Sequence, residues 1–164
     1  LIFPGASRER MFVVGWADRV IASMFPHWSS LHQLVCTASI RDKVTQERQR
    51  ASGSVSQRCM AVAFEILRQA RQDGDLPADS ASDAQVMSGL ISLAKGAHLL
   101  DEGKFLFPAE SGIRPLEMLN QNYHLYLDGV GWKPLSREFD YLATEDRIRR
   151  EVFAEELAEL EARA

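Results

Sequence analysis

The chain has 164 residues, of which 46% are hydrophobic and 26% are charged, which is ordinary for a soluble globular domain. Neither intrinsic disorder nor a membrane-spanning helix is expected, because no run approaches the roughly 18 apolar residues that a span needs. The formal net charge of −4 at pH 7 argues against direct nucleic-acid binding, since a surface that contacts phosphates is usually basic. A separate basic module elsewhere in the same protein is compatible with this charge.

The two cysteines carry no metal-type or disulfide-type pattern. Cys36 and Cys59 lie far apart, each within an apolar, helix-like run. We expect both to be buried, reduced thiols of a cytoplasmic protein. The sequence also shows no basic start followed by an apolar core that would indicate a signal peptide.

Apolar residues recur at helical spacing nearly everywhere, and no run shows the sustained alternation of a strand. The first helix is expected from Ser7, as its N-cap, to about Met24, where a Phe-Pro pair ends it. A second helix is expected to begin at Ser29 or Ser30. The sequence therefore predicts an all-α chain.

The middle of the chain predicts a break followed by a strong helix. Ser52-Gly53-Ser54 is typical of a break, and the helix is expected from about Ser56 to Gly74, which suits the left-handed position just past a helix end. Its core-facing stripe follows the three-four spacing of a packed helix. The stripe comprises Met60, Ala63, Phe64, Leu67 and Ala70.

The next helix, expected over residues 83–100 with Ser80 or Ser82 as its cap, is nearly all apolar or small, and a single lysine interrupts it. A helix this apolar around most of its circumference is buried on more than one side. In a domain of this size, we expect a second copy of the chain to cover the additional apolar side of the helix.

Gly89, Ser92 and Gly96 form a groove of small residues along that helix. A glycine in a helix interior costs about 1 kcal/mol relative to alanine, so two of them require an explanation. Close approach of another helix, a bend beside a cavity and glycines without a role all remain open.

Two further helices are expected near the C-terminus. Pro115 suits the first turn of a helix that ends at residues 128–132. The apolar face of this helix comprises Leu116, Leu119, Tyr123, Leu127 and Val130. Residues 144–164 predict one charged amphipathic helix, with the sparse apolar stripe Ile148, Val152, Leu157 and Leu160.

No pattern of catalytic or metal-binding residues emerges. The chain has neither a nucleophile elbow nor a phosphate-binding glycine loop. His27 and His32 are five residues apart, which places them on different faces of a helix. The isolated His98 and His124 are typical of hydrogen-bonded structural histidines. We therefore expect neither an enzyme nor a metal or other cofactor.

Methionine and aromatic side chains are plentiful among the candidate interior residues. Such side chains usually form core, but flexible methionines beside aromatic walls also suit a pocket for varied apolar ligands. A polar group of the ligand is expected near Tyr123 or His124. From helix position alone, the expected ligand-binding residues are Trp16, Met24, Met60, Phe64, Met87, Leu90, Tyr123 and His124.

The order and spacing of several segments resemble the C-terminal domain of TetR-family transcriptional regulators. Residues 66–76, I-L-R-Q-A-R-Q-D-G-D-L, are similar to the end of the third C-terminal helix of that family. The apolar helix over 84–100 carries Gly96 where the family often has a glycine. Residues 126–135, Y-L-D-G-V-G-W-K-P-L, are similar to the family's closing L-D-G-L-G-W-x-P-L, and residues 3–12 resemble the junction that follows its DNA-binding unit.

The resemblance implies an all-α helical bundle of the TetR C-terminal type that dimerises through a four-helix bundle. Residues 1–140 would form the effector-binding and dimerisation domain, residues 141–164 a charged amphipathic C-terminal helix, and a helix-turn-helix domain would precede Leu1. The homodimer contacts are expected on helices 83–100 and 115–130. They comprise Gly89, Leu93, Gly96, Leu100, Leu119 and Leu127.

The function implied by the resemblance is ligand sensing in a bacterial transcription regulator. A small, mostly hydrophobic effector would shift the population of conformers and so alter DNA binding by the upstream domain. The chain itself would contact neither DNA nor a membrane. A stand-alone helical dimerisation or adaptor module without a small-molecule pocket is the alternative that the sequence leaves open.

Overall fold

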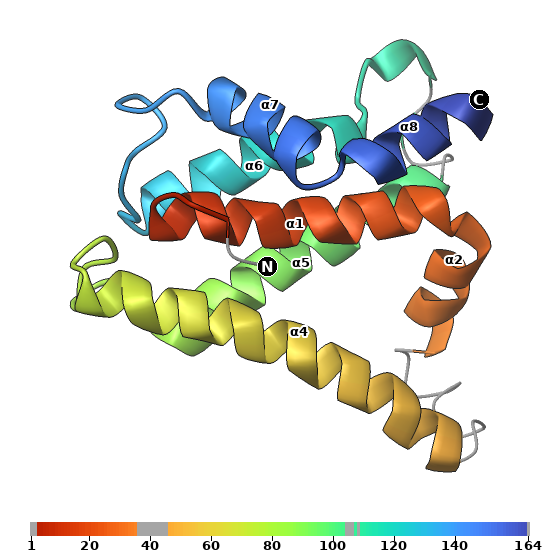
Figure 1. Ribbon diagram of the computed structural model, residues 1–164, viewed down its shortest axis with the longest axis horizontal. Coiled ribbons are helices and arrows are strands. Elements are labelled where there is room, and N and C mark those ends of the chain that lie inside the picture. Colours follow the sequence, from red (N-terminus) through yellow and green to blue (C-terminus); the bar gives the residue numbers. More distant parts are fainter. Residues whose placement is uncertain (1–2, 36–45, 104–106, 108, 164) are drawn as a thin grey trace. The chain divides into compact units, whose positions relative to one another are not determined.

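The computed structural model describes residues 3–35, 46–103, 107 and 109–163, and every regular element within these ranges is a helix (Figure 1). The prediction of an all-α chain is confirmed. The chain divides into two compact units, residues 1–66 together with 141–164, and residues 67–140. The helices are α1 (Ser7–Met24), α2 (Pro26–Val35), α4 (Gln46–Gln72), α5 (Asp83–Gly103), the 3-10 helix η1 (Ala109–Ser111), α6 (Pro115–Gly129), α7 (Tyr141–Glu151) and α8 (Ala154–Arg163).

α1 has the predicted bounds but a different N-cap. Ala6 occupies the N-cap position, and Ser7 is the first residue inside the helix. The Glu9 carboxylate accepts a hydrogen bond from the backbone N–H of Ala6, with Oε2 2.9 Å from the nitrogen. This is the return half of a capping box. The predicted cap at Ser7 is therefore wrong, because Glu9 satisfies the free backbone donor instead.

α2 and α4 both begin earlier than the sequence predicted. α2 begins at Pro26, since the fixed φ of proline and its missing N–H suit the first turn of a helix. α4 begins at Gln46 and continues through Gly53, so the predicted break is wrong. A single interior glycine destabilises a helix by about 1 kcal/mol, and the other residues of a long helix can offset this penalty.

The connection between α4 and α5 is organised by Gly74 and Arg71. Gly74 has a φ of +77°, which confirms the predicted left-handed position after the helix end. The Arg71 guanidinium donates to several groups of the connector, with Nε 3.0 Å from the Asp83 carboxylate and Nη1 2.9 Å from the Ser80 hydroxyl. It also donates to the carbonyl groups of Pro77 and Ala81.

A reciprocal capping box starts α5. The backbone N–H of Ser82 donates to Gln85 Oε1 at 2.9 Å, and the backbone N–H of Gln85 donates to Ser82 Oγ at 3.3 Å. Of the two predicted caps, Ser82 is the one that the structure uses. α5 continues to Gly103, slightly beyond its predicted end.

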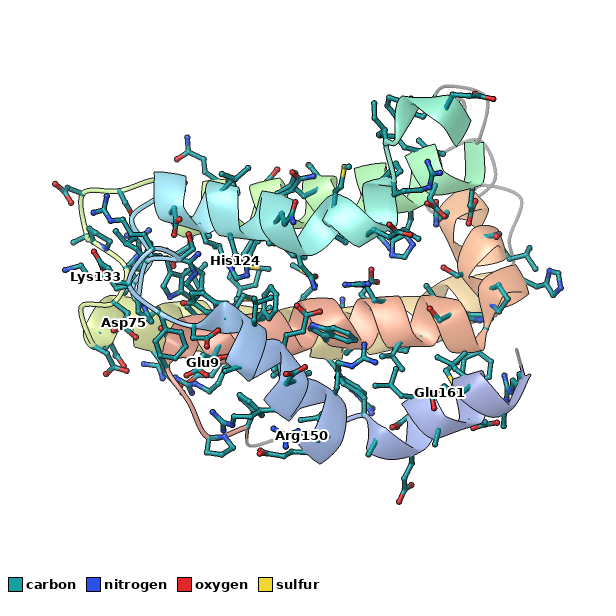
Figure 2. All side chains as sticks on the ribbon, turned by 90° about the horizontal axis from the view of Figure 1, so that it is seen from above. Glu9, Asp75, His124, Lys133, Arg150 and Glu161 are labelled. Carbon is teal, nitrogen blue, oxygen red and sulfur yellow. The ribbon has the colours of Figure 1, made fainter. Side chains whose placement is uncertain are left out.

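α6 follows the prediction closely and packs against α5 (Figures 1 and 2). Pro115 is its first residue, and its buried side chains are Leu119, Tyr123 and Leu127. Beyond the helix, the backbone N–H of Lys133 donates to the Asp75 carbonyl at 2.8 Å, and Figure 2 shows these two residues at the same end of the unit. This hydrogen bond joins the connector before α5 to the segment after α6.

The C-terminal segment forms two helices, so the predicted single helix is wrong. α7 ends at Glu151, and the backbone N–H groups of Val152 and Phe153 both donate to the Ile148 carbonyl. Phe153 lies in the turn between α7 and α8, and its side chain is buried. Both helices contact α1 within their unit (Figure 1).

Candidate functional site

The residues predicted to bind a ligand divide between the two units. Trp16, Met24, Met60 and Phe64 belong to the unit of residues 1–66 and 141–164, whereas Met87, Leu90, Tyr123 and His124 belong to residues 67–140. In the second unit, Met87, Leu90 and Tyr123 are buried on the packed pair α5 and α6, and His124 on α6 is half-buried (Figure 2). In the first unit, Trp16 is buried, Met24 and Met60 are half-buried, and Phe64 is 41% exposed.

Trp16 is the most distinctive of these residues. Its side chain is buried, and its indole Nε1 has no hydrogen-bond partner among the described residues. A buried donor left unsatisfied costs about 1–3 kcal/mol. Trp16, in the middle of α1, is therefore a buried aromatic residue whose indole N–H has no acceptor among the described residues.

Two arginines lie over the Trp16 ring. The guanidinium carbon Cζ of Arg19 is 4.8 Å from the ring centroid, and that of Arg149, on α7, is 5.7 Å from it. Both distances fall within the roughly 6 Å over which a cation is attracted to an aromatic face. Two guanidinium groups thus lie beside the Trp16 ring. No local sequence signal indicated Arg149, because its proximity arises only when α7 packs on α1.

A second polar cluster surrounds Glu9, which is buried near the start of α1 and lies beside α7 in Figure 2. The Thr144 hydroxyl donates to Glu9 Oε1 at 2.8 Å, and Arg147 Nη1 lies 3.6 Å from the same oxygen. Because Oε2 accepts the Ala6 N–H, both carboxylate oxygens have partners. The Glu9 charge is therefore compensated inside the unit.

α7 also contacts residues 3 and 4, which precede α1. The Arg147 guanidinium lies 4.9 Å from the Phe3 ring centroid and donates to the Pro4 carbonyl at 3.0 Å. Arg8 lies 4.8 Å from the Tyr141 ring centroid. We call these contacts, together with those of Glu9 and Thr144, the α1–α7 latch. Residues 3–12 carry its N-terminal half, but the sequence gives no indication of the partner on α7.

The predicted dimer-contact residues occupy two different environments. Leu119 and Leu127 are each 1% exposed, so their side chains are covered within the chain, and their part in a dimer stays a prediction. One apolar stripe of α6 thus packs within its own chain. Gly89, Leu93, Gly96 and Leu100 on α5 are half-buried.

Other apolar side chains, which the sequence did not single out, are exposed on α5 and α6. They follow helical repeats of seven or eight residues and therefore lie on one side of each helix. This set, named here the α5–α6 surface, comprises Ile91 and Leu99 on α5 and Met118 and Leu125 on α6, with exposures of 39%, 64%, 37% and 72%.

Gly89 and Gly96 differ in their surroundings. A Cβ atom added at Gly89 would lie 2.2 Å from the ring and hydroxyl of Tyr126. The Tyr126 hydroxyl donates to the Gln85 carbonyl at 2.9 Å, and burial raises the pKa of Tyr126. Gly96 has no such neighbour within 4 Å. Close helix approach therefore explains Gly89 and not Gly96.

The described residues contain no group of three or more His, Cys, Asp or Glu side chains arranged to hold a metal ion. Cys59 is an exposed free thiol, so its predicted burial is wrong, because the buried stripe of α4 begins only at Ala63. Cys36 and the side chain of His32 lie outside the described residues.

Within the described part of the chain, no helix combines the length and the hydropathy needed to traverse a bilayer. Comparison with protein-family models, with curated proteins and with solved structures finds no significant match to this chain.

Proposed function

We propose that this chain is the ligand-sensing and dimerisation domain of a TetR-like transcriptional regulator. A small, mostly hydrophobic effector binds to it and alters DNA binding by a helix-turn-helix domain that precedes Leu1. Support comes from the sequence resemblance, from the all-α succession of helices and, above all, from the exposed apolar residues of the α5–α6 surface.

The α5–α6 surface suits a second copy of the same chain. Burial of one large apolar side chain stabilises an association by about 1.5–3 kcal/mol, and Leu99 and Leu125 are 64% and 72% exposed. The exposed side of α5 also carries the small residues Ser88 and Ser92, which allow close approach of another helix. A twofold pairing of α5 and α6 buries the same surface on both partners and produces a four-helix bundle.

Effector binding acts through the packing of α1. A ligand that prefers one arrangement of α1 and α7 shifts the population toward it by the difference in its binding free energy between the two arrangements. Because the α1–α7 latch fixes residues 3–9 to α7, such a shift changes the position of the segment that precedes α1. The DNA-binding domains that precede this segment move with it.

Sedimentation equilibrium tests the dimerisation on which this function depends. We expect the wild-type chain to be a dimer at micromolar concentration. Leu125→Glu should weaken the dimer about a hundredfold or more, because a carboxylate buried at the interface has no partner. The matched control is Leu142→Glu on α7, where the side chain is 77% exposed outside the α5–α6 surface, and it should leave the dimer intact.

Circular dichroism of both variants would show that the helices remain folded. A wild-type chain that is monomeric at tens of micromolar would contradict the proposal. The same holds if Leu142→Glu dissociates the dimer as strongly as Leu125→Glu does.

A further inference from the structure

We infer that the effector of the proposed regulator is a carboxylate on an apolar body and that its carboxylate binds at Trp16, Arg19 and Arg149. This inference rests on the proposed function, and it specifies the chemical class of the ligand. It also differs from the sequence-based expectation, which placed the polar group of the ligand near Tyr123 or His124.

The first element of the site is the indole N–H of Trp16. The Trp16 side chain is 4% exposed, and its Nε1 atom is buried without a hydrogen-bond partner among the described residues. An indole nitrogen only donates, so the group that satisfies it must be an acceptor. The cost of leaving the donor unsatisfied is recovered when an acceptor oxygen binds, which gives the site a preference for oxygen-bearing ligands.

The second element is the positive charge beside the ring. Arg19 and Arg149 place two guanidinium groups 4.8 and 5.7 Å from the Trp16 ring centroid. These distances are shorter than the screening length of roughly 8–10 Å at physiological ionic strength. Dissolved salt therefore only partly screens the two charges at the Trp16 ring. Hydrogen bonds to an ionised acceptor are about twice as strong as those to a neutral one. The site therefore selects a carboxylate over an amide, an ester or an alcohol of the same shape.

The third element is apolar and follows Trp16 along α1. Val20 and Met24 come at successive four-residue steps, which places them on the same side of the helix as Trp16. Val20 is buried and Met24 is half-buried. A methionine adapts its shape to different apolar groups, so this side of α1 suits the hydrocarbon part of the ligand.

Two matched pairs of ligands test the inference. They are octanoate with octanamide, and 4-phenylbutyrate with 4-phenylbutanamide, each titrated into the 164-residue chain at pH 7. Affinity is measured by calorimetry, and contact is followed by the ¹⁵N–¹H signals of the three indole groups. The Trp16 signal is identified by its absence in Trp16→Phe. We expect at least one carboxylate to bind about tenfold more tightly than its amide and to shift the Trp16 signal.

Two substitutions separate the contributions of the donor and the cations. Trp16→Phe should weaken carboxylate binding about tenfold, whereas Trp28→Phe, at a side chain that is 56% exposed, should leave it unchanged. Arg149→Gln should lower carboxylate affinity to that of the amide. Arg150→Gln, at the adjacent exposed position, should not change it. Because Arg149 is itself exposed, its substitution keeps the test valid if Trp16→Phe fails to fold.

Equal affinity for carboxylate and amide would overturn the inference, as would binding that leaves the Trp16 signal unmoved. Absence of binding by both carboxylates would also overturn it. None of these outcomes alters the sedimentation result on which the proposed function depends, so failure of the two can be distinguished.

Discussion

Two glycines of α5 lie seven residues apart on the same helix, and the structure separates their roles. Gly89 lies against the Tyr126 ring, whereas Gly96 has open space where its Cβ would be. Gly89→Ala forces the ring away and weakens the hydrogen bond from its hydroxyl to Gln85. We expect it to lower the free energy of unfolding by about 1–3 kcal/mol. Gly96→Ala should raise it by up to about 1 kcal/mol, since only the helix propensity changes.

Urea denaturation of both variants, monitored by circular dichroism at low protein concentration, measures the two effects. If both substitutions change the free energy of unfolding by the same amount and in the same direction, the Tyr126 contact does not explain the glycine at position 89. A loss of dimer in Gly96→Ala at higher concentration would show that this glycine lies at the contact between subunits.

Single residues also show where sequence reasoning reaches its limit. The cost of a helical glycine predicted that Gly89 needs a reason, and the structure supplies it from Tyr126, which a sequence alone cannot place. Trp16 belongs to the predicted ligand-binding residues on the strength of its helix position. Its unsatisfied Nε1 and the nearby Arg149 depend on how α7 packs on α1, and neither has a local signal.

At the level of elements, the α1–α7 latch makes the start of α1 depend on a helix near the other end of the chain. Thr144 and Glu9 are 135 residues apart, and the hydroxyl of Thr144 is one of the few groups that satisfy the buried carboxylate. Thr144→Val keeps the shape but removes the donor. It should lower the free energy of unfolding by about 1.5–3 kcal/mol, the usual worth of a hydrogen bond to a charged group.

Thr144→Ser is the matched control, because it retains the hydroxyl, and it should recover most of the stability lost in Thr144→Val. Chemical denaturation gives both values. If the serine and valine variants are equally destabilised, the methyl packing of Thr144 and not its hydroxyl supports the latch.

Helix boundaries were predictable where a local signal fixes them. Prolines define the end of α1 and the start of α6, and Gly74 marks the end of α4. The continuity of α4 through Gly53 and the turn before α8 were not predictable. In the first case the length of the helix outweighs the preference of one glycine, and in the second no proline or glycine marks the turn in which the buried Phe153 lies.

For the whole molecule, the helical class follows from hydrophobic periodicity, but the surface open to a partner does not. Periodicity marks the stripe that contains Leu119 and Leu127 as apolar, and the structure buries that stripe within the chain. The exposed stripe that contains Met118 and Leu125 is visible only once the packing of α6 on α5 is known. Sequence patterning thus shows which faces of a helix are apolar, but it does not show what each face packs against.

If the α5–α6 surface joins two copies of the chain, stability depends on protein concentration. Only the folded state dimerises, so each tenfold rise in concentration adds about 1.4 kcal/mol per dimer to the free energy of unfolding, or about 0.7 kcal/mol per chain. For a chain of this size that is a rise in Tm of about 2 °C per decade. Differential scanning calorimetry between micromolar and millimolar concentration should show this slope in the wild type. Leu125→Glu should melt at a lower temperature that does not depend on concentration at the micromolar end of this range, and a wild-type Tm that is flat over the same range would exclude dimerisation through this surface.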